Sequence, residues 1–124
     1  MTTFALKRVY DAPDAADGAR ILVDRLWPRG IAKDKARIDL WLKDIAPSTA
    51  LRKRFHGKPD DWEAFCAAYF AELGEAPAQA AAATLHAHRR IGPVTLLYAA
   101  RDTQRNNAAA LKTWLERRPK KDRT

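Results

Sequence analysis

Charged and aromatic side chains are concentrated in the stretch VDRLWPRG, residues 23–30. Asp24, Arg25, Trp27 and Arg29 follow an apolar run that has the length of a strand. Guanidinium groups donate paired, planar hydrogen bonds that match a phosphate or a carboxylate. In open α/β sheets, ligands bind beyond the carboxyl ends of the strands. The stretch therefore predicts one wall of an anion-binding crevice.

Two further segments are expected to end at the same edge of the sheet. They are KDIAPS, residues 43–48, and YAARD, residues 98–102, and each leads toward a helix start. The free N–H groups of helix starts also favour anions, and Arg105 is a further donor near the second segment. The predicted ligand-binding residues are Arg25, Trp27, Arg29, Ser48, Arg101 and Asn106.

Three polar groups at these strand ends are candidates for acid–base chemistry. Asp24 becomes a general base if burial raises its pKa, and a helix cap or a salt bridge is the alternative. Tyr98 can donate a proton or line the pocket, and as an aromatic residue in a buried strand it needs no function. Asp102 is the third weak candidate.

Structural roles compete with ligand binding for two of these residues. Arg25 can form an ion pair with Asp44 or Asp102 instead of holding a ligand. For Trp27, a place in the core or in the pocket wall is favoured over a platform that stacks on a base.

Other catalytic and metal-binding patterns are not found in the sequence. Cys66 lies on an apolar helix stripe and is interpreted as a core thiol. His86 and His88 are two residues apart on a predicted helix, which does not match a metal pair at i, i+4, and His56 stands alone. A glycine-rich phosphate loop, a zinc pattern and a Ser-His-Asp arrangement are also missing. We therefore predict no metal and no cofactor.

The composition is that of one globular domain. The chain has 124 residues, of which 47% are hydrophobic and 31% charged. No apolar run approaches the roughly 20 residues that a membrane span requires. The first residues, MTTFALKRVY, lack the apolar core of a signal peptide. A single cysteine fits a reducing compartment, so a cytoplasmic protein without membrane contact is predicted.

The net charge of +8 is unevenly distributed. The segment RRPKKDRT, residues 117–124, holds five basic residues against one acidic residue, so it contributes half of the excess. We therefore predict a domain over residues 1–118 and a basic tail over residues 119–124. Such a tail can bind phosphate backbones, which makes a nucleic-acid-associated module the alternative function, but more often it only keeps a protein soluble.

The pattern of apolar residues predicts alternating strands and helices. Strands are expected at 4–10, 20–27 and 94–100, and helices at 49–55, 62–73, 77–90 and from Asn106 or Asn107 to 115. Residues 31–36 favour one helical turn, and 38–45 is ambiguous, with strand favoured over helix.

Two details of this pattern position the elements. Residues 94–100 form a continuous apolar run and are expected to be a central strand. Helix 62–73, with Asp60 and Glu63 as an acidic capping box, is expected to face the sheet through Trp62, Phe65, Tyr69 and Leu73. The predicted fold class is α/β: a small single domain with a mostly parallel sheet covered by helices, a Rossmann-like layered sandwich.

Four blocks of the chain resemble one bacterial family. GARILVDRLWPRGIAK, IDLWLKDIAPSTALRKRF, DDWEAFCAAYFAEL and GPVTLLYAARDTQRNNAAALKTWL follow one another as in the YeaO-like proteins of the domain of unknown function family 488. The resemblance covers about residues 6–117. It implies a compact, layered, Rossmann-like α/β domain, and no established activity. The name uroporphyrin methyltransferase, attached to some relatives, has no support in a chain without a glycine-rich cofactor loop.

One segment departs from that family. Many relatives carry a histidine in the segment that reads TQRNNA here, where Arg105, Asn106 and Asn107 stand instead. If that histidine is an acid or a base in those relatives, this chain lacks it, while an anion site can persist. The sequence thus predicts a protein that binds, or acts on, an anionic, phosphorylated or nucleotide-like small ligand. It specifies neither a reaction nor an oligomeric state.

Overall fold

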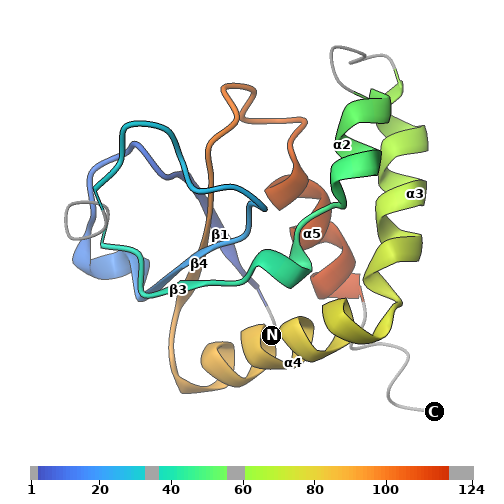
Figure 1. Ribbon diagram of the computed structural model, residues 1–124. Helices are drawn as coiled ribbons and strands as arrows, with labels where there is room; N and C mark the ends of the chain where they lie inside the picture. The colour runs from blue at the N-terminus through green and yellow to red at the C-terminus, as the bar shows by residue number, and fades with distance from the viewer. Residues whose placement is uncertain (1–2, 33–36, 56–60, 118–124) are drawn as a thin grey trace.

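The computed structural model describes residues 3–32, 37–55 and 61–117. Four parallel strands form one sheet in the order β1-β4-β2-β3, and four α-helices accompany it (Figure 1). The strands are β1 (Ala5–Arg8), β2 (Ala19–Leu22), β3 (Leu40–Trp41) and β4 (Val94–Tyr98). The helices are α2 (Thr49–Phe55), α3 (Trp62–Leu73), α4 (Ala76–Ile91) and α5 (Asn107–Arg117), with 3-10 helices at Ala15–Asp17 and Lys43–Ile45. The predicted small α/β fold is confirmed.

Strand β4 is central, as its apolar run predicted. It lies between β1 and β2, and Leu96 pairs with Leu6 on one side and with Ile21 on the other. Leu96 and Leu97 point to opposite faces of the sheet, and both have 0% of their surface exposed. Both faces of this strand are therefore covered, which explains why it contains no polar alternation.

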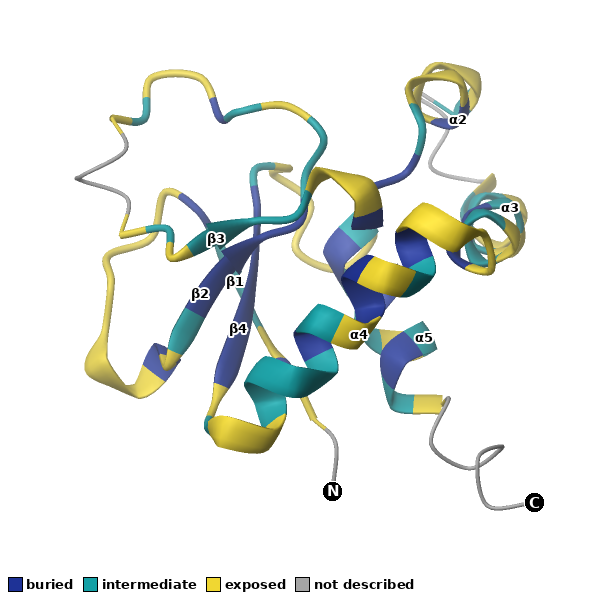
Figure 2. Cartoon of the chain, turned by 60° about the horizontal axis from the view of Figure 1, so that its bottom comes forward, coloured by how far each residue is buried: buried dark blue, intermediate teal, exposed yellow. Residues whose placement is uncertain are grey.

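The helices cover only one face of the sheet (Figures 1 and 2). Helices α4 and α5 contact β4, whereas α3 packs mainly on α2, α4 and α5. Of the side chains expected to face the sheet, Tyr69 and Leu73 are buried in the cluster that contains Ile21. Trp62 and Phe65 are only partly buried beside it, so the first turn of α3 lies at the margin of the core.

The opposite face is covered by loops, unlike the two-sided Rossmann arrangement. A second apolar cluster forms there around Leu22 and Leu97, and Trp27 and Trp41 of the chain between β2 and α2 pack against it. No described residue between β2 and β3 is helical. Residues 33–36, which belong to the helical turn predicted at 31–36, lie outside the described residues.

Element boundaries differ from the predicted ones mainly at the carboxyl ends of strands. Strand β1 was expected to reach residue 10 and β2 to reach residue 27, but they end at Arg8 and Leu22. The ambiguous segment 38–45 contains both alternatives, a two-residue strand followed by the 3-10 helix Lys43–Ile45. The chain leaves the sheet early at this edge because side chains take over the backbone hydrogen bonds, as described below.

Side chains cap the starts of two helices. The Ser48 hydroxyl accepts a hydrogen bond from the backbone N–H of Leu51 at 3.1 Å, and the Asn106 side chain accepts one from Ala109 at 2.7 Å. These side chains fix where α2 and α5 begin. The predicted capping box of α3 depends on Asp60, which lies outside the described residues.

Candidate functional site

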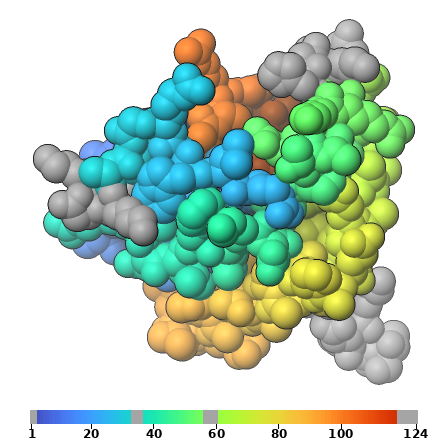
Figure 3. Space-filling view, in the orientation of Figure 1, coloured from blue at the N-terminus to red at the C-terminus, as the bar shows by residue number. Residues whose placement is uncertain are grey.

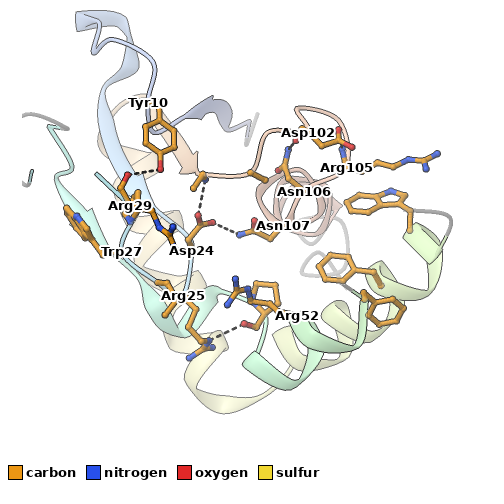
Figure 4. Close-up of a pocket in the computed structure, with 18 residues that line it drawn as sticks. Tyr10, Asp24, Arg25, Trp27, Arg29, Arg52, Asp102, Arg105, Asn106 and Asn107 are labelled. Carbon is orange, nitrogen blue, oxygen red and sulfur yellow. Dashed lines mark hydrogen bonds between the residues drawn. The ribbon is translucent and has the colours of Figure 1, made fainter. Parts of the chain in front are cut away.

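A pocket of about 770 Å³ lies at the carboxyl ends of the strands. The surface is hollowed between the segment after β2, the loop after β4 and helix α2 (Figure 3). Figure 4 shows the side chains that line it. They are Tyr10, Asp24, Arg25, Leu26, Trp27, Pro28, Arg29, Pro47, Arg52, Phe55, Trp62, Phe65, Ala99, Ala100, Asp102, Arg105, Asn106 and Asn107. Its volume is in the range of small-ligand sites.

Asp24 interrupts the hydrogen bonding between β2 and β4 at the floor of this pocket. The last regular bond between β2 and β4 runs from the Val23 N–H to the Leu97 carbonyl, at 3.1 Å. The parallel pattern would next join the Ala99 N–H to the Val23 carbonyl. Instead, Ala99 donates to the Asp24 carboxylate at 2.9 Å, and the Asn107 amide donates to both the Val23 carbonyl and Asp24, each at 3.0 Å. The side chains of Asp24 and Asn107 thus replace one backbone hydrogen bond between β2 and β4.

Burial raises the pKa of Asp24, and this effect outweighs the others. The hydrogen bonds from Asn107 and Ala99 and the charge of Arg52 lower the pKa without cancelling the effect of burial. No cation forms a salt bridge with Asp24 in the part of the chain that the structure describes. The site therefore holds a carboxyl group with neutral partners next to a cavity.

Arg25 links two segments of the chain at the pocket wall by hydrogen bonds. Its guanidinium donates to the Pro47 carbonyl at 3.1 Å and to the Ala46 carbonyl at 3.0 Å. The expected alternative of an ion pair with Asp44 or Asp102 is not formed. Arg25 thus ties the segment after β2 to the start of α2, which leaves fewer of its N–H groups for a ligand.

Arg29 and Trp27 line the pocket in different ways. Arg29 is exposed at the rim, and its backbone carbonyl accepts a hydrogen bond from the Tyr10 hydroxyl at 3.0 Å. The Trp27 indole donates to the Ile31 carbonyl at 2.8 Å and packs edge-to-face on Trp41, with ring centroids 5.3 Å apart. Trp27 therefore belongs to the pocket wall and to the cluster on the loop-covered face, as the favoured interpretation held.

The loop after β4 is shaped by its own polar side chains. The exposed Asp102 carboxylate accepts hydrogen bonds from the N–H groups of Gln104 and Arg105, which lower the pKa of Asp102. Asn106 is 5% exposed and donates to the Asp102 carbonyl at 2.8 Å while it caps α5. Both line the pocket, and both have a structural task in the turn that leads into α5.

Three predicted site residues do not line the pocket. The Ser48 hydroxyl and N–H donate to the carboxylate of Glu72, at 2.6 and 2.8 Å. Tyr98 is 3% exposed in the core on the helix-covered face, where burial raises its pKa. Arg101 is exposed beside the loop. Their predicted ligand contacts thus find no geometric support.

Sequence reasoning missed several lining residues on the two helices nearest the pocket. Arg52 on α2 lies close enough to Asp24 to lower its pKa, and it points into the pocket in Figure 4. Phe55, one turn further, lines the same pocket. Because α2 follows a strand end in the sequence, the i, i+3 spacing of these residues was a usable signal. Asn107 was considered only as a cap, and its neighbour Asn106 takes that role.

Taken together, the lining groups have an excess of positive charge. The lining contains four arginines and two aspartates.

Among the described residues, no group of three histidine, cysteine, aspartate or glutamate side chains is placed to hold a metal ion. Cys66 is partly buried against the core, and burial raises its pKa. No described helix is long and apolar enough to cross a membrane.

Comparisons with known proteins identify the family. A family model described as the inactive DUF488-N3 subclade matches residues 3–124. Uncharacterized protein YeaO of Escherichia coli (strain K12) is 48% identical over 109 residues, which cover 88% of this chain and 93% of YeaO. Uncharacterized protein Rv3073c of Mycobacterium tuberculosis (strain ATCC 25618 / H37Rv) is 41% identical over 110 residues, or 89% of this chain and 91% of that protein. No solved structure gives a significant match. The chain therefore belongs to the DUF488 family, as a YeaO-like member of it.

Proposed function

We propose that this protein binds a small anionic ligand, phosphorylated or nucleotide-like, in the pocket at the carboxyl ends of its strands. The observation that carries the proposal is the excess of guanidinium groups in one concave site: Arg25, Arg29, Arg52 and Arg105 line it together with only Asp24 and Asp102. Arginine is the side chain best matched to the oxygens of a phosphate.

The arginines divide into one that supports the wall and three that face the ligand. Arg25 is engaged with the carbonyls of Ala46 and Pro47. Arg29, Arg52 and Arg105 are exposed at the pocket, where a ligand can reach them. We assign the recognition of the anion to these three.

Asp24 also supports an anionic ligand, despite its own charge. Its pKa is raised, so its carboxyl group takes up a proton more readily than an exposed aspartate does. A protonated carboxyl group can donate a hydrogen bond to a ligand oxygen, whereas an ionised one only accepts. Anion binding near Asp24 therefore favours its neutral form.

Binding without turnover is the form of the proposal that the comparisons support. The matched family model is described as an inactive subclade. The family resemblance implies a histidine in the segment that has Arg105, Asn106 and Asn107 here. Asn106 and Asn107 are instead held by hydrogen bonds that shape the sheet edge and the start of α5. Asp24 remains the candidate acid or base if a reaction occurs.

The test compares arginines inside and outside the pocket. Inorganic phosphate and ribose 5-phosphate are titrated into the wild type, Arg29→Ala and Arg52→Ala by calorimetry and thermal shift. Each substitution is expected to weaken binding by roughly 1.5–3 kcal/mol, the scale of a hydrogen bond to a charged group. The matched control is Lys53→Ala, which removes one exposed positive charge from α2 outside the pocket.

Equal losses in the control and in the two arginine variants would reduce the effect to net charge and end the proposal. Binding of single-stranded oligonucleotides with a steep salt dependence, lost in a chain that stops at Arg117, would instead favour the nucleic-acid-associated module.

A further inference from the structure

Three aromatic rings form one wall of the pocket. Phe55 of α2 and Trp62 and Phe65 of α3 all line it, and all three are partly exposed. Phe65 is the middle member: its ring stacks on Trp62 with centroids 5.6 Å apart and meets Phe55 edge-to-face at 5.8 Å. The rings therefore support one another as a continuous apolar surface that ends at the cavity.

The three rings pack against the core of the domain, but the core covers them only in part. The stripe of α3 is fully buried only at Tyr69 and Leu73, further along the helix. At its first turn the stripe emerges from the core beside the cavity, and Trp62 and Phe65 remain partly in contact with solvent. Large aromatic rings contribute most to stability when they are covered. A surface of this kind next to a cavity is a place for an apolar part of a ligand.

The wall and the anion-binding groups belong to the same pocket. Arg52 precedes Phe55 by three residues on α2, so one face of this helix presents both a guanidinium group and a ring to the cavity. A bare phosphate would leave most of the roughly 770 Å³ unfilled. The pocket therefore has room for a second, flat and apolar part of the ligand beside its anionic group.

We propose that the ligand is an aromatic anion of the nucleoside monophosphate class, with its ring packed on Phe55, Trp62 and Phe65 and its phosphate held by Arg29 and Arg52. This inference rests on the proposed function and names its ligand class. Stacking tolerates different bases because each has a π-face, so purine and pyrimidine nucleotides are both accepted.

A series of four probes separates the ring from the phosphate: inorganic phosphate, ribose 5-phosphate, AMP and adenosine. AMP is expected to bind about 10-fold or more tightly than ribose 5-phosphate, the gain that stacking of one base typically provides. UMP should show a gain in the same direction. Adenosine, which lacks the anionic group, should bind more weakly than AMP.

Substitutions on α3 test the wall itself. Trp62→Leu should reduce the ratio of AMP to ribose 5-phosphate affinity several-fold while the affinity for ribose 5-phosphate stays unchanged. Phe70→Leu is the matched control, because Phe70 is a partly buried ring of the same helix that lies outside the pocket. If the Trp62 variant does not fold, Phe55→Leu makes the same test from α2. Quenching of tryptophan fluorescence by AMP in the wild type, lost in the Trp62 variant, is a second readout.

The outcomes separate the two proposals. Failure of all phosphate-containing probes to bind would overturn the proposed function and this inference together. Equal binding of AMP and ribose 5-phosphate would overturn the inference alone and leave an anion site. A drop in the ratio in Phe70→Leu as large as that in Trp62→Leu would also overturn it, because the effect would then come from the packing of α3.

Discussion

The two ends of strand β2 each carry an aspartate, but they surround it with different partners. Asp17 precedes the strand and accepts hydrogen bonds from the side chains of Lys7 and Arg20, at 3.1 and 2.6 Å. Asp24 follows the strand and accepts hydrogen bonds only from neutral groups, the Ala99 N–H and the Asn107 amide. The amino end of the sheet is closed by ion pairs, and the carboxyl end opens into the pocket.

The pKa values of the two carboxyl groups follow this difference. Burial raises the pKa of Asp17, but the hydrogen bonds from Lys7 and Arg20 outweigh burial and hold it below the usual value. For Asp24, burial outweighs its hydrogen bonds, and the pKa is raised. A buried carboxylate with two salt-bridge partners has a structural role, whereas a carboxyl group without a salt bridge beside a cavity is available to a ligand.

Glycine substitutions at the two ends should show the largest contrast. Gly18 has φ of 65°, and a Cβ there would lie 2.2 Å from the Pro93 carbonyl oxygen, so Gly18→Ala must push apart the starts of β2 and β4. We expect a loss of roughly 4 kcal/mol or more in the free energy of unfolding. Gly30 has φ of 78° and nothing within 4 Å of that position, so Gly30→Ala should cost only about 1–2 kcal/mol of backbone strain.

Urea unfolding of both glycine variants measures this difference. A similar loss for the two would mean that the amino end is no more tightly packed than the carboxyl end. The comparison would then rest on the aspartates alone.

Neutralising the two aspartates tests their roles directly. Asp17→Asn removes the carboxylate that forms salt bridges with Lys7 and the buried Arg20, so it should lower the free energy of unfolding by about 3–5 kcal/mol. Asp24→Asn keeps an oxygen that can accept from Ala99 and removes a charge that burial already disfavours, but its new NH2 group faces the Asn107 amide and that hydrogen bond is lost. Its cost should be about 1–2 kcal/mol, and its effect on phosphate affinity should be neutral or favourable.

The same two variants also supply the contrary result. If Asp24→Asn loses as much stability as Asp17→Asn, the carboxylate of Asp24 contributes as much to the stability of the fold as the ion-paired carboxylate of Asp17. The pocket would then lose its main candidate for ligand chemistry.

Much of the fold could be predicted because it depends on local apolar patterns. The continuous run of residues 94–100 identified the central strand, observed at Val94–Tyr98, and the stripe of Trp62–Leu73 identified α3. The loop-covered face could not be predicted, because it is buried by Trp27 from the irregular chain after β2 and by Trp41 from a strand of only two residues. The early end of β2 was missed for a related reason: it depends on Asn107, which lies 84 residues from Val23 in the chain.

The pocket lies at the edge of the sheet for which a site was predicted, but its lining differs in part from the predicted residues. VDRLWPRG does line the pocket, since the rule for strand ends depends only on topology. Arg25 turned inward to backbone carbonyls and Arg101 turned outward, and neither orientation is encoded in a local pattern. Arg52 and the aromatic wall were missed because helix 62–73 was expected to face the sheet and helix 49–55 was given no role in the site. Only the packing of α2 and α3 against each other brings these residues to the cavity.

The smallest expected effect is a difference in pH dependence between the two ends. Asp17, with its pKa lowered in the folded state, contributes stability that is present above the unfolded value of about 3.8 and is lost as the pH falls through the folded pKa. Asp24 has the opposite sign. Its folded pKa is raised, so the folded state binds more protons between about 3.8 and that pKa, and stability falls as the pH rises through this interval.

Melting temperatures of the wild type and Asp24→Asn from pH 3 to pH 7 isolate this effect. Above pH 3.8 the wild type should lose more stability with rising pH than the variant, because only the wild type must ionise a carboxyl group that burial keeps neutral. Below pH 3.8 both should fall together, because both retain Asp17. Sulfate, which stays doubly charged over most of this range, should raise the melting temperature of the wild type more at pH 5 than at pH 7, and this pH dependence should be absent in the variant. Parallel curves for the two proteins with and without sulfate would show that Asp24 ionises like an exposed aspartate, and the contrast between the two ends of β2 would lose its electrostatic basis.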